Sequence, residues 1–405
     1  MRLLDLLLIA PILFSSADCG GRSSLDTVTA NFGGMISIGG ATGTGDAPST
    51  GGVIPAGGSP NIGGTKAKGG YVSTGGTPNT GGTTSTGGIP ATGGKMITGG
   101  TTATVASISA IAAGDVFTCA LVNGSPFCWG DNTYDQLGNN STTGSLVPVQ
   151  VHDLTSGVTA IHAGDCHTCA LVNGGVKCWG CGGNGRLGNN STINSPVPLD
   201  VQGLTSGVTA IDIGFSHSCA VANGSAHCWG SNYYGQLGDN STTDRWVPVE
   251  VQGLTSGVSA IAVGTHFTCT LVDGGVKCWG VNNYGDLGSH SRVSSLVPID
   301  VQGLTTGVTA IDSGNQHTCA LVNGIAYCWG YNGFGALGNN STAIDSTVPV
   351  TVHDLPAEVR RISAGYNQTC ALVDGVAYCW GNNAYGQLGN NSTTHNNVPV
   401  QVLFP

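Results

Sequence analysis

The cysteines of this chain recur at a spacing that favours disulfide chemistry. The sequence has 405 residues and 15 cysteines, and six segments of the kind CALVNGSPFCWG each contain two cysteines nine residues apart. In the first segment Asn123-Gly124 lies midway, which is a signal for a two-residue hairpin turn. Counting outward from that turn places the cysteines opposite each other at a non-hydrogen-bonded position, where a disulfide can form. The pattern predicts six bridges: Cys119–Cys128, Cys169–Cys178, Cys219–Cys228, Cys269–Cys278, Cys319–Cys328 and Cys370–Cys379.

The second segment carries two further cysteines, Cys166 and Cys181, which the same count brings opposite each other. It predicts a seventh bridge, Cys166–Cys181, at a nominally hydrogen-bonded position where the strands splay near Gly180. Zinc binding is the alternative explanation of so many cysteines, but zinc sites use short Cys-x₂₋₄-Cys knuckles. Only the stretch 166–169 resembles one, so we expect no metal.

Carboxylates and a histidine share another recurring slot, two residues before a repeated glycine. That slot holds, in chain order, Ala112, His162, Asp212, Ala262, Asp312 and Ser363. If the strand that carries it lines a central channel, Asp212 and Asp312 approach each other with His162. Paired carboxylates can perform general acid-base chemistry, so a carbohydrate-active lyase or hydrolase is one functional hypothesis.

The segments that must position these residues repeat every 50 or 51 residues. No helical period appears, and the second unit contains four short strands at Val147–Val151, Val158–Ala163, His167–Val172 and Val176–Gly180. Six such units predict an all-β fold in which four-stranded blades surround an axis, a β-propeller. The last unit ends on an extra Val398–Val402 strand, which we expect to complete the first blade and close the ring.

The repeat G-x-x-H-[TS]-C-A-L-V-x-G-x-x-x-C-W-G-x-N-x-x-G-x-L-G resembles that of the regulator of chromosome condensation family over residues 101 to 405. Within one unit the matching positions are Gly214, His217, Trp229, Gly230, Asn232, Gly235, Leu237 and Gly238. The resemblance implies a propeller, usually of seven blades where six units are counted here, and a role in binding proteins. One bacterial relative inhibits β-lactamase with one propeller face. Guanine-nucleotide exchange does not fit an exported protein.

Two residue types repeat in nearly every unit and are expected to be structural. A tryptophan occupies the same slot six times, as Trp129, Trp179, Trp229, Trp279, Trp329 and Trp380. A residue that every blade requires equally is expected to pack between neighbouring blades. The histidines at 167, 217 and 317 share a slot with two phenylalanines and a glutamine, which favours a structural hydrogen bond over catalysis.

The start of the chain indicates export. Residues 1–18 read as a signal peptide with a short apolar core, and Ser16-Ala17-Asp18-Cys19 resembles a bacterial lipoprotein box in which Cys19 is lipidated. An ordinary cleaved signal is the alternative. Residues 19–104 are rich in glycine, threonine and serine and predict a disordered tether, followed by the propeller at 105–405. The protein is then an outer-membrane or cell-surface lipoprotein, or secreted, and stable disulfides fit that compartment.

The loops that differ between units are the candidate binding residues. Aromatic residues share one loop slot, while an arginine and a tryptophan precede one VPV strand; these are Tyr134, Tyr234, Tyr284, Phe334 and Tyr385, with Arg245 and Trp246. Arginine and aromatic residues are typical of protein-binding hot spots. A further variable set follows the repeated glycine and includes Phe215 and Tyr366.

The composition of the chain argues against several classes of partner and cofactor. The net charge is −10 with only 12 lysines and arginines, which argues against a nucleic-acid partner. No Walker loop, dinucleotide fingerprint or nucleophile elbow is present, so no cofactor is expected. We expect a monomeric, non-enzymatic propeller that binds a protein or, second, a polysaccharide, with membrane contact only through a lipid anchor. The alternatives are the carbohydrate-active enzyme and a structural coat component.

Overall fold

The computed structural model describes residues 107–356 and 358–404 and shows six four-stranded antiparallel sheets. The expected signal peptide, Cys19 and the tether lie outside these residues. Each sheet is built from four consecutive strands. In chain order the strands are β1 (Ile108–Ala113), β2 (Phe117–Val122), β3 (Ser125–Gly130), β4 (Ser145–Gln150), β5 (Val158–Ala163), β6 (His167–Val172), β7 (Gly175–Gly180), β8 (Ser195–Asp200), β9 (Val208–Ile213), β10 (His217–Ala222), β11 (Ser225–Gly230), β12 (Arg245–Glu250), β13 (Val258–Val263), β14 (Phe267–Val272), β15 (Gly275–Gly280), β16 (Ser295–Asp300), β17 (Val308–Ser313), β18 (His317–Val322), β19 (Ile325–Tyr331), β20 (Asp345–Thr351), β21 (Val359–Ala364), β22 (Gln368–Val373), β23 (Val376–Gly381) and β24 (Asn396–Gln401).

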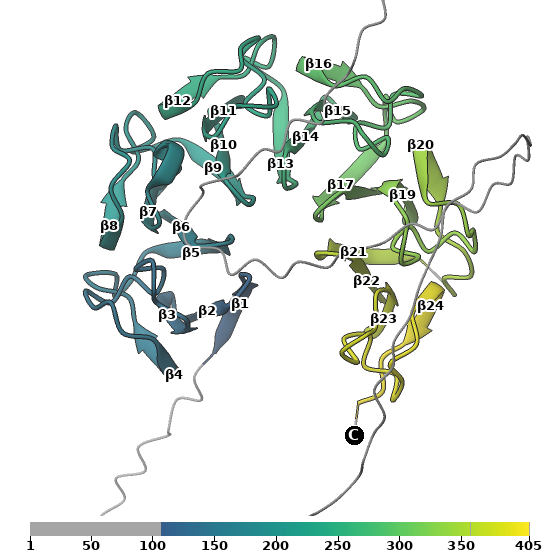
Figure 1. Cartoon of the computed structure of the whole chain (residues 1–405), viewed down its shortest axis with the longest axis horizontal. Helices are drawn as coiled ribbons and strands as arrows, with labels where there is room; N and C mark the ends of the chain where they lie inside the picture. The colour runs from purple at the N-terminus through teal and green to yellow at the C-terminus, as the bar shows by residue number, and fades with distance from the viewer. Residues whose placement is uncertain (1–106, 357, 405) are drawn as a thin grey trace, which may run out of the picture. The chain divides into compact units, whose positions relative to one another are not determined.

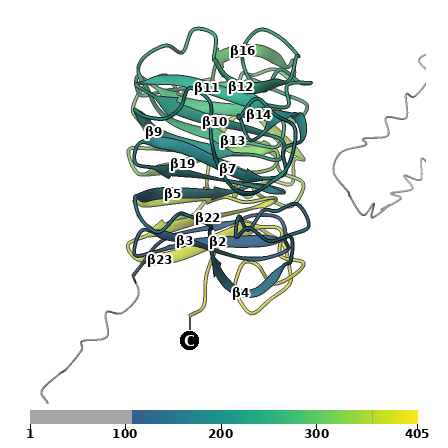
Figure 2. The same ribbon diagram turned by 90° about the vertical axis from the view of Figure 1, so that its left-hand side faces the viewer.

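The six sheets are arranged as blades around a central axis, which confirms the predicted propeller (Figure 1). The first strand of each blade lies nearest the axis and the fourth lies outermost. In side view the strands run between the two faces of the ring (Figure 2). Among the described residues the single helical element is the short 3₁₀ turn η1 (Gly183–Gly185), and nothing there is helical over the length that a bilayer requires.

The central hairpin of every blade has the predicted register. In the first blade the turn residues Asn123 and Gly124 have φ angles of 52° and 76°, as a type I′ turn requires, and Cys119 pairs with Cys128. All six predicted hairpin disulfides are present, each with a Cα–Cα distance of 4.1 Å. Each blade therefore has a covalent bond across its two middle strands.

The grouping of strands into blades differs from the sequence prediction. The sequence pattern places the Val147–Val151 segment at the start of the second unit, but most of it lies in β4, which pairs with β3 of the first blade through Val149 and Cys128. Likewise β24 pairs with β23 of the sixth blade and does not complete the first blade. The connection over residues 151–157 is what carries the chain to the next blade. The expected closure by Val398–Val402 is therefore wrong.

The predicted seventh disulfide is also corrected. Cys166 and Cys181 are buried and face each other as thiols rather than as a disulfide. The backbone N–H of Cys181 donates to the carbonyl of Cys166 at 2.8 Å, so the pair occupies the hydrogen-bonded position, where opposed Cα atoms lie further apart. A hydrogen bond between the thiols, together with burial, raises the pKa of Cys166, and Arg186 Nη1 donates to its Sγ at 3.3 Å.

Tryptophan joins blades two to six to the blade before each of them, as predicted. Five indole Nε1–H groups donate at 2.8–3.0 Å to a loop carbonyl of the preceding blade: Trp179 to Gln136, Trp229 to Arg186, Trp279 to Gln236, Trp329 to Asp286 and Trp380 to Ala336. All five tryptophans are fully buried. Packing and a directional hydrogen bond therefore coincide at every one of these junctions.

The repeated histidines also bridge blades. His167, His217 and His317 place Nε2 at 2.9–3.0 Å from a hydroxyl of the next blade, on Ser218, Thr268 and Thr369. Burial lowers the pKa of His217 to about 3 and that of His317 to about 4, so these imidazoles are neutral. Their role is structural, as the sequence indicated.

The tryptophan junction predicts a specific loss of stability. Trp229→Phe removes the N–H that the Arg186 carbonyl accepts and leaves space beside it, so unfolding free energy should fall by about 2 kcal/mol. Trp246→Phe is the control, because that ring is 48% exposed, and its effect should stay within about 0.5 kcal/mol. Denaturant titration of the oxidised protein measures both. Equal losses of unfolding free energy in the two variants would show that the hydrogen bond of the buried indole makes no specific contribution to stability.

Candidate binding face

The variable loops all leave the same side of the ring. Because the strands of each blade are antiparallel and sequential, the loop between the first and second strands and the loop between the third and fourth emerge at one end. We call this side the aromatic face. It carries the sequence-predicted residues Tyr134, Tyr234, Tyr284, Phe334, Tyr385, Arg245 and Trp246, which lie in or beside the loops between third and fourth strands.

A buried asparagine holds most of these long loops in one shape. In the third blade Asn232 Nδ2 donates to the carbonyls of Ser241 and Thr243, each at 3.1 Å, while its Oδ1 accepts the N–H of Leu237 at 3.0 Å. Equivalent bonds are made by Asn132, Asn282, Asn332 and Asn383. One side chain thus satisfies three backbone groups of its loop. The loop backbone therefore keeps the same course in these five blades, while the exposed side chains differ from blade to blade.

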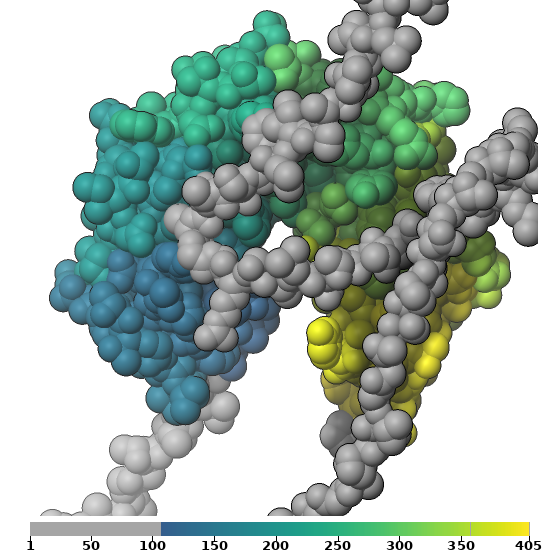
Figure 3. Space-filling model, in the orientation of Figure 1, coloured from purple at the N-terminus to yellow at the C-terminus, as the bar shows by residue number. Residues whose placement is uncertain are grey.

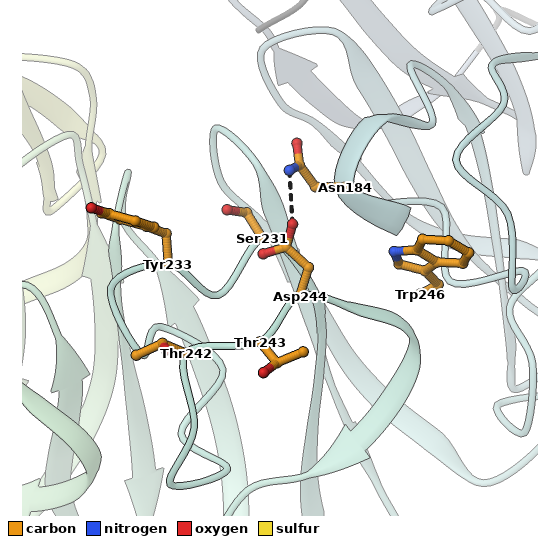
Figure 4. Close-up of a pocket in the computed structure, with 7 residues that line it drawn as sticks. All are labelled: Asn184, Ser231, Tyr233, Thr242, Thr243, Asp244 and Trp246. Carbon is orange, nitrogen blue, oxygen red and sulfur yellow. Dashed lines mark hydrogen bonds between the residues drawn. The ribbon is translucent and has the colours of Figure 1, made fainter. Parts of the chain in front are cut away.

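The second blade lacks this asparagine, and a hollow lies beside it. Gly182 replaces asparagine there, the loop forms η1, and Asn194 Oδ1 accepts the Gly182 N–H at 3.0 Å. The hollow has a volume of about 640 Å³ and is open to solvent. Figure 4 shows its lining by Asn184, Ser231, Tyr233, Thr242, Thr243, Asp244 and Trp246.

Asp244 connects the two blades that border the hollow. Its Oδ2 accepts from Asn184 Nδ2 at 2.9 Å across the junction, and its Oδ1 accepts the Asn232 N–H at 2.8 Å within its own blade (Figure 4). Trp246 backs onto Gly185, where a Cβ atom would lie 2.5 Å from the Trp246 Cα. The glycine therefore lets the two blades approach closely enough to present the indole at the rim.

Aromatic rings from successive blades meet on the aromatic face. Tyr234 packs against His266 of the next blade with ring centroids 4.7 Å apart, and against Tyr233 at 4.9 Å. Further along, Tyr284 packs against Tyr331 at 4.9 Å. The series continues from Tyr331 to Phe334 and from Phe334 to His395. These contacts hold partly exposed rings in place across blades three to six.

The predicted residues have different surroundings. Tyr234, Tyr284 and Phe334 belong to the ring contacts, and Trp246 borders the hollow, whereas Tyr385 projects with 92% of its surface exposed. Arg245 forms an ion pair with Asp239, Nη2 to Oδ2, at 2.7 Å. Tyr134 lies in the loop of the first blade between β3 and β4, where its N–H donates to Gln136 Oε1 at 2.8 Å.

Several residues of this face were not among the predictions. Tyr233, Tyr331, His266 and His395 complete the ring contacts. Tyr233 and Tyr331 were visible as aromatic residues near the WG signature, but the histidines occupy slots that hold other residue types in the remaining units. Only the three-dimensional position of a neighbouring loop makes them part of the surface.

The residues two positions before the repeated glycine form the predicted cluster around the axis. The carboxylates of this cluster accept hydrogen bonds from backbone N–H groups. His162 Nδ1 lies 3.0 Å from Asp212 Oδ1 of the next blade. Asp212 also accepts the N–H groups of Ile213 at 2.9 Å and Val263 at 2.7 Å, and thereby joins three blades. Asp312 accepts the N–H of Ser313 at 3.0 Å and that of Ala364, in the sixth blade, at 2.9 Å. Backbone N–H groups therefore donate to both carboxylates, and these hydrogen bonds hold neighbouring blades together.

Burial and the charges within this cluster shift the pKa values of two of its members. Burial, followed by the charge of Asp212, raises the pKa of Asp312 to about 7. Burial alone would lower the pKa of His162, but its hydrogen bond to Asp212 and the charges of Asp212 and Asp312 hold that pKa above its ordinary value. The described residues contain no group of three or more histidine, cysteine or acidic residues that could hold a metal.

The fold and the repeated residues define a class of propeller, and the family comparison agrees. Residues 70–369 match the model of the RCC1-like domain, and residues 374–405 match the regulator of chromosome condensation (RCC1) repeat. Because the first match covers more than half of the 405 residues, the chain belongs to the RCC1-like family. No curated protein matches the sequence significantly.

Two solved structures illustrate the likeness. Human WBSCR16 has 23% identity and a TM-score of 0.67, over 74% of this chain and 82% of that one. Yeast RCC1 (Prp20) bound to Kap60 has 22% identity and a TM-score of 0.63, over 73% and 75%. Another structure of Prp20p, from Saccharomyces cerevisiae, is described with its binding properties to Gsp1p and histones. At these identities the likeness establishes the fold alone.

The channel cluster predicts how stability depends on pH. Between the ordinary aspartate pKa of 3.8 and about 7, folded Asp312 binds a proton that the unfolded chain releases, so the folded state loses stability as pH rises through this window. The unfolding free energy of the unmodified protein should therefore fall from pH 4 to 8 relative to Asp312→Asn. Asp153→Asn is the control, since its side chain is 88% exposed. Parallel curves for the unmodified protein and Asp312→Asn would contradict the assignment.

Proposed function

We propose that this protein is an extracytoplasmic, surface-tethered and monomeric propeller that binds another protein through its aromatic face. The observation that supports this most is the series of partly exposed rings on loops of constant shape. Rings held by neighbours lose little freedom on binding, which lowers the entropic cost of association. Aromatic anchors of this kind are enriched in protein-binding hot spots.

Membership of the RCC1-like family supports a binding role, because propellers of this family commonly serve as scaffolds for protein interaction. The Prp20 structures concern complexes and binding properties with Kap60, Gsp1p and histones, which are properties of that protein. The net charge of this chain is −10, which argues against nucleic acid as the partner.

The disulfides support the extracytoplasmic assignment. The six blades contain one disulfide each. Disulfides form and persist in oxidising compartments and are rare in the cytosol. Residues 1–18 resemble a signal peptide, and Cys19 would supply a lipid anchor if the lipoprotein box is used. The low charged fraction, 8%, suits a neutral extracellular scaffold.

An enzymatic role through the channel carboxylates receives less support. Both oxygens of Asp212 accept backbone N–H groups, and the channel-strand carboxylates bridge neighbouring blades. A general base needs a lone pair directed at substrate, which these contacts oppose. The proposal is therefore a binding protein without catalytic residues.

Binding through the aromatic face predicts loss on truncating its rings. The full oxidised chain, immobilised, should retain a protein from surface and secreted extracts of the source cells, identified by mass spectrometry against a reduced control. With that protein purified, Trp246→Ala and Tyr234→Ala should each weaken affinity about tenfold or more, measured by titration calorimetry.

The matched control lies on the opposite face. Ile325 is 48% exposed directly after a hairpin turn, and Ile325→Ala should leave the affinity unchanged. Unchanged affinity in both aromatic variants, or equal loss in all three, would exclude the aromatic face as the binding surface.

A further inference from the structure

Two aromatic side chains that line the hollow are particular to the third blade. Trp246 occupies a slot without a ring in the other blades, where the residues are Leu146, Pro196, Leu296, Thr347 and Asn397. Tyr233 occupies a second such slot, which elsewhere holds Thr133, Gly183, Asn283, Gly333 and Ala384. Trp246 is 48% exposed and Tyr233 is 62% exposed. The repeat therefore requires neither ring, and the blade does not bury them.

The other side of the hollow lacks a ring that the remaining blades possess. Asn184 of the second blade lies in the slot that holds an aromatic residue in the other five: Tyr134, Tyr234, Tyr284, Phe334 and Tyr385. The shorter side chain leaves room at this junction and places an amide where the other loops carry a ring. The resulting volume of about 640 Å³ lies within the roughly 300–1,000 Å³ that is typical of small-ligand sites.

Polar groups converge between the two rings. Asp244 accepts one hydrogen bond at each carboxylate oxygen, from the Asn232 N–H and from Asn184 Nδ2. A carboxylate has about four acceptor positions and a primary amide has two N–H groups, so both side chains keep capacity for a ligand. In Figure 4 these two side chains and Ser231 lie between the rings of Tyr233 and Trp246. The hydroxyl groups of the lining, which both donate and accept, belong to Ser231, Thr242 and Thr243.

Protein contacts hold both rings in place. Tyr233 packs edge-on against Tyr234, with ring centroids 4.9 Å apart and an interplanar angle of 88°. The Trp246 carbonyl accepts the N–H of Asn190 of the second blade at 2.9 Å, and the Trp246 Cα packs against Gly185. A side chain that is fixed before binding loses little conformational freedom on binding. The hollow is therefore a preorganised site.

The charges around the hollow favour a neutral ligand. None of its seven lining residues is basic, and the neighbouring Arg245 forms an ion pair with Asp239 at 2.7 Å. At the slot of Asp244 the fifth blade has Asp345, which binds both terminal nitrogens of Arg292. Asp244 instead has a neutral amide as its partner across the junction. An anionic ligand would therefore meet a carboxylate that no arginine neutralises.

We infer that the hollow binds a neutral hexose unit of a saccharide. A pyranose ring has a face of C–H groups, which packs on an exposed indole, and a rim of hydroxyls that donate and accept hydrogen bonds. Trp246 supplies the apolar surface, and Asp244 and Asn184 supply an acceptor and a donor side by side. A polysaccharide and the glycan of a glycoprotein both contain such a unit. This inference does not rest on the protein partner proposed above.

Titration of the full oxidised chain with neutral tetrasaccharides of glucose, galactose, mannose or N-acetylglucosamine tests the site. At least one should bind saturably, with a Kd of about 1 mM or less by calorimetry, and should change the indole fluorescence. Trp246→Ala should weaken that binding about tenfold or more and remove the fluorescence change. Leu146→Ala is the matched control, because Leu146 occupies the same slot of the first blade and is 101% exposed, and it should bind like the unmodified protein. Absence of saturable binding, or equal loss in both variants, overturns the inference.

Asp244→Asn tests the polar half of the site in a folded protein. Asparagine fills this slot in the second blade, where Asn194 accepts the Gly182 N–H, so the variant keeps an acceptor for its own loop. Loss of the charged acceptor should weaken saccharide binding about tenfold, with the denaturation midpoint unchanged. Saccharide affinity equal to that of the unmodified protein contradicts the assigned role. Choline is the counter-probe, since rings beside a carboxylate also suit a quaternary ammonium. Binding of choline but of no saccharide overturns the inference.

Two further measurements identify the source of the hexose. Retention of purified cell-surface polysaccharide by the immobilised protein, lost in Trp246→Ala, assigns the site to a free saccharide chain. A retained glycoprotein that loses its Trp246-dependent affinity after enzymatic deglycosylation assigns the site to a glycan of the partner. Both results support the inference. The tetrasaccharide titration contains no protein partner, so its failure leaves the proposed function standing, and failure to capture a protein leaves the saccharide result standing.

Discussion

The hydrogen bond between a buried tryptophan indole and a loop carbonyl of the preceding blade is the contact on which the rest of this structure depends. A blade of four short strands has two apolar faces and cannot bury them alone. The indole fills the space between neighbours, and its single donor requires the adjacent loop to lie at one distance. That requirement positions the loops between third and fourth strands in blades one to five, because the accepting carbonyl belongs to the same loop that carries the variable rings.

A disulfide in every blade and a buried asparagine in five of the six make that position reproducible. The disulfide between the middle strands keeps the hairpin register, since a shift of one residue would turn the cysteines to opposite faces. The buried asparagine satisfies three backbone groups of the long loop and so allows its surface residues to change without changing its course. The second blade shows the converse: with Gly182 in place of asparagine, the loop adopts another course and the hollow beside Trp246 lies next to it.

The features that the sequence predicted correctly are local ones. Three of the four strands assigned to the second unit lie within one hairpin and its neighbour, and their bounds are reproduced within one residue. The errors concern contacts that cross from one unit to the next. A VPVxV strand can pair with the strand before it or open the following unit, and the periodic pattern is the same in both cases; only the pairing of Val149 with Cys128 distinguishes them. The closure of the ring failed for the same reason, because β24 finds its partner within its own blade.

The sequence by itself determined the strand type, the hairpin register and the six disulfides, because each follows from residues fewer than a dozen positions apart. It also determined the repeat, because the same segment recurs every 50 or 51 residues. The tertiary structure alone decided which loops share a face, which rings touch, and how the channel carboxylates are satisfied. Tyr234 meets His266, and Asp212 meets Val263, across junctions of adjacent blades. Such contacts depend on the angle between blades, which the packing of whole sheets sets and no local pattern encodes. It also left Ile111 of the first blade and Leu372 of the sixth exposed, whereas Ile161 and Leu321 at the same positions of neighbouring blades are buried. Figure 3 shows a space between the first blade, in blue, and the sixth, in yellow.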